Sequence, residues 1–238
     1  LPNRPDIDPR ALNTNAPQEI NTSRAGIRLD QNLGKKNSLV LLHNLTIQSI
    51  DAFQLVAGQN PDTAIRSHRS RATWTHRFST ATSMDISAGF DRVSSLLIPE
   101  PNAVGHWVFL SFDIQDLGPS PTIPIDRAEN TFSYAGVIQH VRGRHTLTAG
   151  LEALRFQVNG AESDSHRGIE VYAADDRGDA ITNLRMGTPN RFVQALGNTH
   201  RGYRNWRMGL FVGDVWRLGP KVTLNMGLRY EPVTTPVE

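Results

Sequence analysis

The sequence predicts an all-β fold with about eight antiparallel strands in four up-and-down hairpins. Three observations support this prediction. Apolar and polar residues alternate along several segments, short turns join these segments in pairs, and long connections separate the pairs. Alternation with a period of two indicates a strand whose two faces meet different environments.

The clearest hairpin lies near the end of the chain. Between residues 222 and 230 every even position is apolar and every odd position is polar or glycine. The partner segment, 205–218, alternates in the same way except at Asp214. The linking turn contains Gly219 and Pro220, which are strong turn residues. This pattern is typical of a tight β-hairpin.

Three further hairpins follow from the same pattern. The predicted strand pairs are 23–33 with 39–47, 72–78 with 84–90, and 132–142 with 146–158. Each pair is joined by a turn of about four or five residues, a length common in antiparallel hairpins. The connections between the pairs are much longer and span 51–68, 99–130 and 159–204.

The unequal connections distinguish between kinds of β-protein. Compact soluble domains rarely contain structureless loops longer than about 12–15 residues. In an up-and-down arrangement, the three long loops fall on one rim and the short turns on the other. This is the plan of transmembrane β-barrels of the outer membrane. The sequence therefore predicts an antiparallel up-and-down transmembrane β-barrel segment.

Composition agrees with this interpretation. The chain of 238 residues has a formal net charge of +2 and no lysine- or arginine-rich tract, so we expect no nucleic-acid partner. It contains no cysteine, which excludes disulfides and thiolate metal sites in this sequence. No apolar run reaches the roughly 20 residues of a membrane helix. Barrel strands need only about ten alternating residues.

The alternation also predicts which side chains face lipid and which face the lumen. Six aromatic residues are expected near strand ends, where barrels place rings at the bilayer interfaces; ordinary strand packing is the alternative. They are Trp74, Phe78, Phe90, Trp206, Trp216 and Tyr230. The predicted lumen-facing polar residues are Arg28, Asp30, Arg71, Arg77, Asp85, Asp91, Glu152, Arg229 and Glu231.

No catalytic, cofactor-binding or metal-ligating residue is predicted, and the chain is not expected to be an enzyme. The sequence has no HExxH, G-x-S-x-G, P-loop or GxGxxG motif. The eight histidines are expected at turns or at the rim of the barrel, and the alternative is a metal site formed by histidines from separate loops. They are His43, His68, His76, His106, His140, His145, His166 and His200.

Two charged groups of the last long loop have competing interpretations. Asp175, Asp176 and Asp179 lie beside Arg177 and suggest either a cation-binding loop or, as we favour, a solvated loop. The arginines there suggest either anionic ligands or a solvated surface; the ligand-binding residues remain unassigned. These arginines are Arg167, Arg177, Arg185, Arg191, Arg201 and Arg204.

Residues 211–217 and 220–231 resemble a stretch in the barrel of TonB-dependent receptors, with departures at Gly213 and Val215. Residues 142–152 resemble another hairpin of that family. Residues 1–3 and 27–31 resemble the large members that carry a carboxypeptidase-regulatory-like domain at the N-terminus. The resemblance implies a plugged barrel of about 22 strands. It also implies the outer membrane as location, with membrane lipid, the TonB complex and an unknown imported ligand as partners.

We therefore expect residues 1–238 to form part of a receptor barrel, with the plug and signal peptide outside this sequence. Residues 235–238 do not have the pattern of a closing strand, so the barrel is expected to continue beyond them or before Leu1. The alternatives are a surface or secreted β-sandwich adhesin that binds glycans, and a passive porin. A hydrolase is the weakest alternative because no nucleophile–base arrangement is visible.

Overall fold

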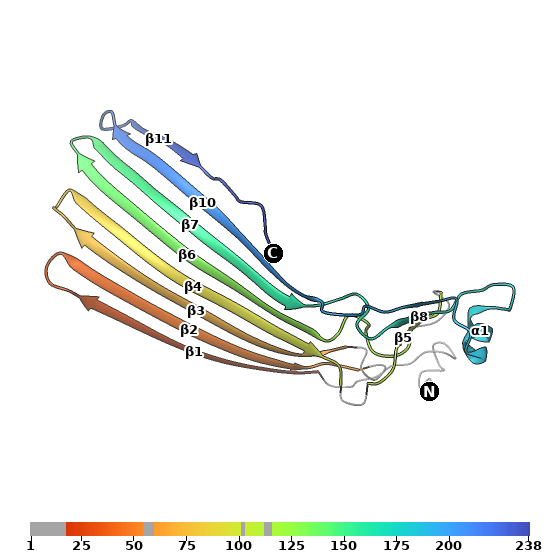
Figure 1. Ribbon diagram of the computed structural model, residues 1–238. Helices are drawn as coiled ribbons and strands as arrows, with labels where there is room; N and C mark the ends of the chain where they lie inside the picture. Colours follow the sequence, from red (N-terminus) through yellow and green to blue (C-terminus); the bar gives the residue numbers. More distant parts are fainter. Residues whose placement is uncertain (1–17, 55–59, 101–102, 112–115) are drawn as a thin grey trace.

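The computed structural model describes residues 18–54, 60–100, 103–111 and 116–238, and one large antiparallel sheet dominates them (Figure 1). Its eight strands follow the order of the chain, so every strand pairs with its sequence neighbours in the sheet. The strands are β1 (Glu19–Asn32), β2 (Asn37–Asp51), β3 (Asp62–Arg77), β4 (Thr82–Ile98), β6 (Ile125–Arg142), β7 (His145–Ala161), β10 (His200–Arg217) and β11 (Thr223–Tyr230).

The four predicted hairpins are confirmed. β1 pairs with β2, β3 with β4, β6 with β7, and β10 with β11, each in antiparallel register. Short turns join the two strands of every hairpin and lie together at one end of the sheet, and the long connections lie at the other end (Figure 1). The expected asymmetry between the two rims is therefore present.

Register divides the sheet into an apolar face and a polar face. Directly paired residues lie on the same face, and Leu29 pairs with Leu41, which pairs with Ala72 and then Ala88. All nine residues predicted to face the lumen share the opposite, polar face, where for example Arg71 pairs with Gly89 and Asp91 with Arg69. The alternation in the sequence thus becomes a physical separation of two surfaces.

The apolar face is not covered by protein. Leu228 is 74% exposed and Ile27 is 69% exposed, whereas a core position would be close to zero. Each of the eight strands contacts only its neighbours along the sheet, and no second layer packs against them in the described chain. A β-sandwich places its apolar residues between two sheets, so this arrangement contradicts the sandwich alternative.

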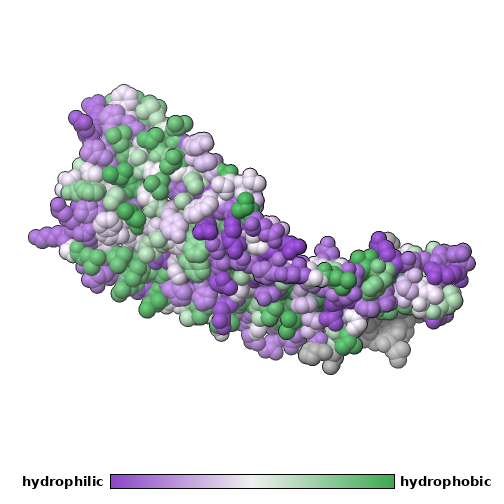
Figure 2. Space-filling view, in the orientation of Figure 1, coloured by the Kyte–Doolittle hydropathy of each residue, from purple (hydrophilic) through white to green (hydrophobic). Residues whose placement is uncertain are grey.

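The apolar face is as wide as a bilayer core. On β10 the outward residues from Trp216 to Trp206 are ten positions apart, which corresponds to about 34 Å along the strand. A strand tilted by about 45° then covers roughly 25 Å of membrane thickness, the height of the apolar band in outer-membrane barrels. Hydrophobic side chains gather towards the short turns, and hydrophilic ones increase towards the long loops (Figure 2).

The predicted positions of the aromatic residues are partly wrong. Trp74, Phe78, Trp216 and Tyr230 lie near strand ends as expected, but Phe90 and Trp206 lie well inside β4 and β10. These strands have 17 and 18 residues, whereas a bilayer needs about 9–11. Phe90 and Trp206 mark the point at which the apolar outer surface ends and the strands continue beyond it.

The long loops were predicted to be longer than they are, because the strands continue beyond the apolar band. β3 begins at Asp62, β6 at Ile125 and β10 at His200, so each strand starts inside a segment predicted as loop. Residues 66–71 are arginine, serine and histidine only. This part of β3 has no apolar side because it lies past the lipid-facing band, and its strand pattern is therefore invisible to hydrophobic alternation.

Both long edges of the sheet are open within the described residues. β1 and β11 each have one paired neighbour, and they do not pair with each other. Beyond β11 the chain continues along β10, where Val237 accepts a hydrogen bond from the Arg204 amide and Pro232 accepts one from the Met208 amide. The described residues include no helix with the length and hydrophobicity of a membrane span.

Ile86 and Ser87 provide a matched test of the two faces. Ile86 lies near the middle of the apolar run of β4, and Ser87 faces the polar side. Ile86→Arg should destabilise the membrane-inserted protein by about 2–4 kcal/mol, the cost of arginine near the bilayer midplane. Urea titration of protein folded into phospholipid vesicles measures this cost.

Ser87→Arg is the control for added charge and size. It should change stability by less than half of the effect of Ile86→Arg, because its side chain points away from lipid. Equal destabilisation by the two substitutions would contradict the assignment of the faces.

Candidate functional site

Two parts of the molecule can contact a solute: the polar face of the sheet and a folded module on the long-loop rim. The rim module consists of β5 (Trp107–Phe109), β8 (Ile169–Val171), α1 (Ala180–Met186) and β9 (Arg191–Val193) with their connections. It lies beyond the end of the large sheet that is opposite the short turns (Figure 1). None of these four elements was predicted from the sequence.

Ion pairs organise the polar face. Arg71 Nη2 donates to Asp91 Oδ2 at 2.6 Å, and Arg69 Nε donates to the other oxygen at 3.2 Å. Near the opposite edge, Arg229 donates to Glu152 at 2.6 Å and to Glu231 at 2.7 Å. The Asp91 pairs join β3 to β4 and the Glu152 pair joins β7 to β11, so these ion pairs orient charged groups across the surface that faces away from lipid.

Two glycines make room for large side chains on this face. A Cβ atom at Gly89 would lie 2.4 Å from Arg71 Nη1, and one at Gly150 would lie 2.4 Å from the Phe211 ring. The Arg229 guanidinium lies over the Phe211 ring at 5.5 Å. A cavity of about 200 Å³ lies beside Arg229 and Glu152. The polar face therefore carries shaped, charged recesses.

The rim module has its own small core. β5 pairs in parallel with β8, and β8 pairs antiparallel with β9. Leu110, Tyr172 and Ala180 are buried together at its centre. The long loops are thus folded, contrary to our expectation of irregular connections. Val108 and Leu184 pack against this cluster, which joins β5 to α1.

Asp179 and Gly187 fix the ends of α1. The Asp179 side chain accepts a hydrogen bond from the Thr182 amide at 2.7 Å. Hydrogen bonding with the Thr182 side chain, followed by this amide bond, lowers the pKa of the Asp179 carboxyl. Gly187 ends the helix with φ = 66°, in the left-handed region that glycine tolerates. An aspartate cap followed eight residues later by glycine is the sequence signal for this helix, although it was not recognised among the predicted loop residues.

The Asp175 carboxylate joins the segments around α1. It accepts hydrogen bonds from the Arg177 backbone and side chain, from Asn183 Nδ2 at 3.0 Å and from Asn190 Nδ2 at 2.7 Å. The bonds from Arg177 make the largest contribution to lowering the Asp175 pKa. Both oxygens are occupied by donors, so this carboxylate holds the loop together and the cation-binding alternative loses its central ligand.

A histidine, a glutamate and a tyrosine form a second polar cluster. His106 Nδ1 lies 2.9 Å from Glu170 Oε1, and the Tyr172 hydroxyl donates to Glu170 Oε2 at 3.0 Å. The hydrogen bond with His106 is the main cause of a lowered Glu170 pKa, and burial raises the pKa of Tyr172. The cluster links β5 to β8.

The rim module also exposes apolar side chains that lipid cannot cover. Leu196 is 85% exposed and Val104 is 79% exposed, and Phe192 is half-exposed beside the His106 ring. These residues lie on the long-loop rim, outside the apolar band. Exposed apolar groups surrounded by polar ones are a feature of binding surfaces.

The histidines lie in three settings. His76, His140 and His145 lie near the short turns, where the Trp216 ring stacks on His145 and Asp214 accepts a hydrogen bond from it at 2.6 Å. His43 and His68 lie inside β2 and β3, and His106, His166 and His200 lie on the long-loop side of the molecule. Within the described parts of the chain, no three histidine, aspartate or glutamate side chains are grouped so as to hold a metal ion.

The arginines of the last long loop also separate. Arg177 pairs with Asp175, Arg167 donates to the Ala103 carbonyl, and Arg201 pairs with Glu238. Arg204 lies within β10 and donates to Asn159 at 2.6 Å. Arg185 and Arg191 lie exposed in the rim module. The six arginines therefore do not form one cluster, and anionic ligands and a solvated surface both stay interpretations of this loop.

A family model described as an outer membrane beta barrel domain matches residues 1–238. The chain belongs to this family. The match places the chain in the outer membrane, as expected, and explains why its apolar face is exposed. No curated protein matches the sequence.

Two solved structures share the fold of this outer-membrane barrel domain. The outer membrane transporter YddB from Escherichia coli has a TM-score of 0.57 and 16% identity, over 90% of this chain and 27% of that chain. FpvA from P. aeruginosa, in a complex with a heterologous pyoverdine and iron, has a TM-score of 0.60 and 12% identity, over 92% and 32%. The predicted resemblance to the barrels of TonB-dependent receptors is confirmed at the level of the fold.

Asp175→Asn should loosen the rim module, because the amide keeps at most part of the hydrogen bonding and removes the ion pair with Arg177. We expect faster hydrogen exchange in α1, measured by mass spectrometry. Because its pKa is lowered in the folded protein, Asp175 stabilises the module fully above the ordinary carboxyl pKa of about 3.9. This contribution declines as the pH falls below that value.

Asp176→Asn is the matched control, since the Asp176 side chain is exposed and makes no hydrogen bond in the described structure. It should leave exchange in α1 unchanged, and acid should accelerate exchange less in Asp175→Asn than in the wild type. Equal exchange in the two variants would contradict the joining role of Asp175.

Proposed function

We propose that this barrel domain is part of an outer-membrane transporter in which the rim module captures a solute at the cell surface. The single observation that carries the proposal is a folded module on the long-loop rim with uncovered Leu196, Val104 and Phe192 side chains. Long loops of outer-membrane barrels face the cell exterior. A loop that only closes the barrel needs neither a core nor an exposed apolar surface.

The polar face supplies the second part of the proposed path. Its Arg–Asp and Arg–Glu pairs face the inside of a barrel, and its recesses leave room for water or solute. A barrel with all strands paired is required in lipid, so we propose that β1 and β11 pair with further strands of a larger barrel. The chain spans 27% and 32% of the two similar structures, which agrees with such a partial barrel.

We further propose that uptake is driven through the TonB complex by a plug, as the family resemblance implies, and that the chain performs no catalysis. A passive porin makes the opposite prediction about energy. An energised receptor stops accumulating its solute when a protonophore removes the membrane gradient, whereas a passive pore continues to equilibrate it.

The test compares depletion of solutes from the growth medium by cells that carry the wild-type protein, no protein, or a module-deleted protein. Ala161 and His200 are register partners at the ends of β7 and β10. Residues 162–199 can therefore be replaced by a short glycine-rich turn that keeps this hairpin. Mass spectrometry of the medium detects whichever solute the cells deplete.

We expect wild-type cells to deplete at least one solute from the medium. Cells with the module-deleted protein should not deplete this solute, although that protein still inserts in the membrane. A second variant, with Val104→Ser and Leu196→Ser, should reduce depletion while leaving the module folded. Unchanged depletion by both variants would contradict capture by the rim module. Depletion that persists with protonophore would contradict energised uptake and favour the porin.

A further inference from the structure

The outer surface of the strands carries a cationic belt directly beyond the apolar band. On β4 the outward residue after Phe90 is Arg92, on β7 the one after Ala153 is Arg155, and on β10 Trp206 is followed by Arg204. His68 and Arg66 occupy these positions on β3, and Arg92 is the register partner of His68. The step from an apolar to a basic residue thus occurs on β3, β4, β7 and β10, whereas on β6 the neutral Asn130 follows Phe132.

The belt contains no acidic residue over the middle of the sheet. From β3 to β10, the first two outward positions beyond the apolar band on each strand include no aspartate or glutamate. At the same height the polar face mixes both signs, for example in the Arg69–Asp91 pair. Solvation alone does not require positive charges only on the outer face and charges of both signs on the polar face.

Arg66 and Arg92 lie close together without an anionic partner. Their positions are diagonal across β3 and β4, a separation of about 7–8 Å between backbones. Arg66 makes no ion pair within the described structure, and Arg92 donates only to the neutral Asn130 side chain, at 2.9 Å. Neighbouring like charges destabilise a sheet, so a bound anion between them is favourable.

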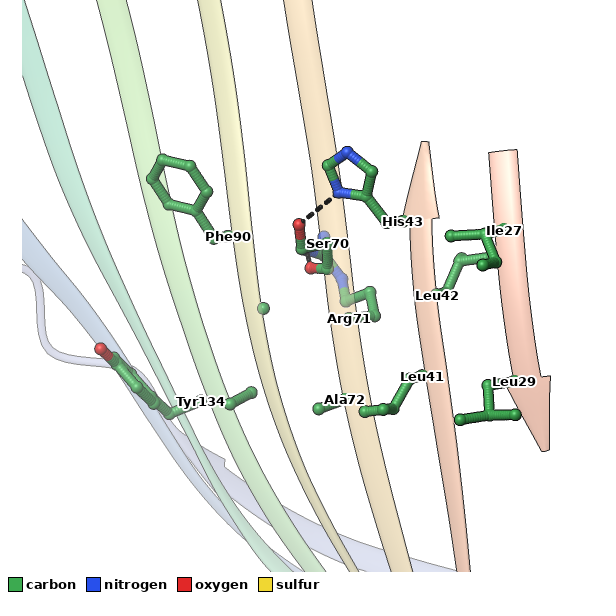
Figure 3. A pocket seen from close by; sticks show the side chains of 12 residues that line it. Ile27, Leu29, Leu41, Leu42, His43, Ser70, Arg71, Ala72, Phe90 and Tyr134 are labelled. Atoms are coloured by element: carbon green, nitrogen blue, oxygen red, sulfur yellow. Dashed lines mark hydrogen bonds between the residues drawn. The ribbon is translucent and has the colours of Figure 1, made fainter. Parts of the chain in front are cut away.

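An apolar groove lies beside these cations on the same face, on the membrane side. Its volume is about 530 Å³, and it lies between Leu41 and Tyr134 with the small residues Ala72 and Ala88 as its floor. Figure 3 shows Leu29, Leu41 and Ile27 on one side of the groove and Phe90 and Tyr134 on the other, with His43 bonded to Ser70 at 2.9 Å near its end.

We propose that the outer face of β2–β4 binds a phosphorylated glycolipid of the outer leaflet, with an acyl chain in the groove and a phosphate against Arg66, His68 and Arg92. The order of groups along the strands matches such a lipid. Ala88, Phe90 and Arg92 follow each other at intervals of about 7 Å, which places the cation above the apolar groove. Transport plays no part in this binding.

The experiment measures binding of fluorescent bisphosphorylated lipid A to the protein in nanodiscs. Arg66→Gln with Arg92→Gln should weaken binding roughly tenfold or more, the order expected when two cations near an anionic lipid surface are lost. Arg24→Gln with Arg77→Gln removes the same charge from the polar face and should change the affinity less than twofold. Heat-modifiable migration in electrophoresis checks that both variants are folded.

Ala88→Phe fills the groove and leaves all cations in place, so it tests the acyl chain separately. Ala88→Phe should weaken binding of the acylated lipid. Removal of the phosphates from lipid A should weaken its binding to the wild-type protein about as much as the Arg66→Gln, Arg92→Gln substitutions weaken binding of the phosphorylated lipid. Equal losses in the two double arginine variants, full binding without phosphate, or inorganic phosphate binding as tightly as the lipid would overturn the proposal.

Discussion

The exposed apolar face is the constraint on which the rest of the structure depends. Leucine, isoleucine and valine side chains that are half or more exposed in water would leave a large unfavourable surface. In lipid the exposed apolar surface carries no such free-energy penalty. Unpaired backbone amide and carbonyl groups are unfavourable there instead, so all backbone hydrogen bonds must be made within the sheet. Long, regular antiparallel pairing from β1 to β11 meets this requirement for every strand except the two at the edges.

The same constraint explains which parts could be predicted from the sequence. The four hairpins were recognisable because lipid on one side and water on the other impose strict alternation, as in β11 from Leu224 to Tyr230. The extensions beyond the apolar band, such as residues 62–71 of β3, have polar surroundings on both sides and carry no such signal. Phe90 and Trp206 were misplaced for this reason: the end of the lipid band is not the end of the strand.

The rim module could not be predicted because its stability has another origin. Its elements are short, with three-residue strands and a seven-residue helix, too short for hydrophobic periodicity. Its order depends on individual contacts instead: the Asp175 carboxylate, the Asp179 cap and the buried Leu110 and Tyr172 side chains. The buried cluster joins Leu110 to the distant Tyr172 and Ala180, and the Asp175 bonds depend on how the loop folds, so Asp175 was recognised as part of an acidic group but its structural role was not.

Two kinds of arginine follow from this division of environments. On the polar face, Arg71 and Arg229 have carboxylate partners close by on other strands. On the outer face, Arg66 and Arg92 lie at the height where the apolar band ends, and their counter-charge is absent from the described part of the protein. Membrane lipids carry phosphate at this height, so the protein has no need to supply an acid there. The sheet thus pairs Arg71 and Arg229 with its own carboxylates on the face directed away from lipid and leaves Arg66 and Arg92 without such a partner at the edge of the apolar band.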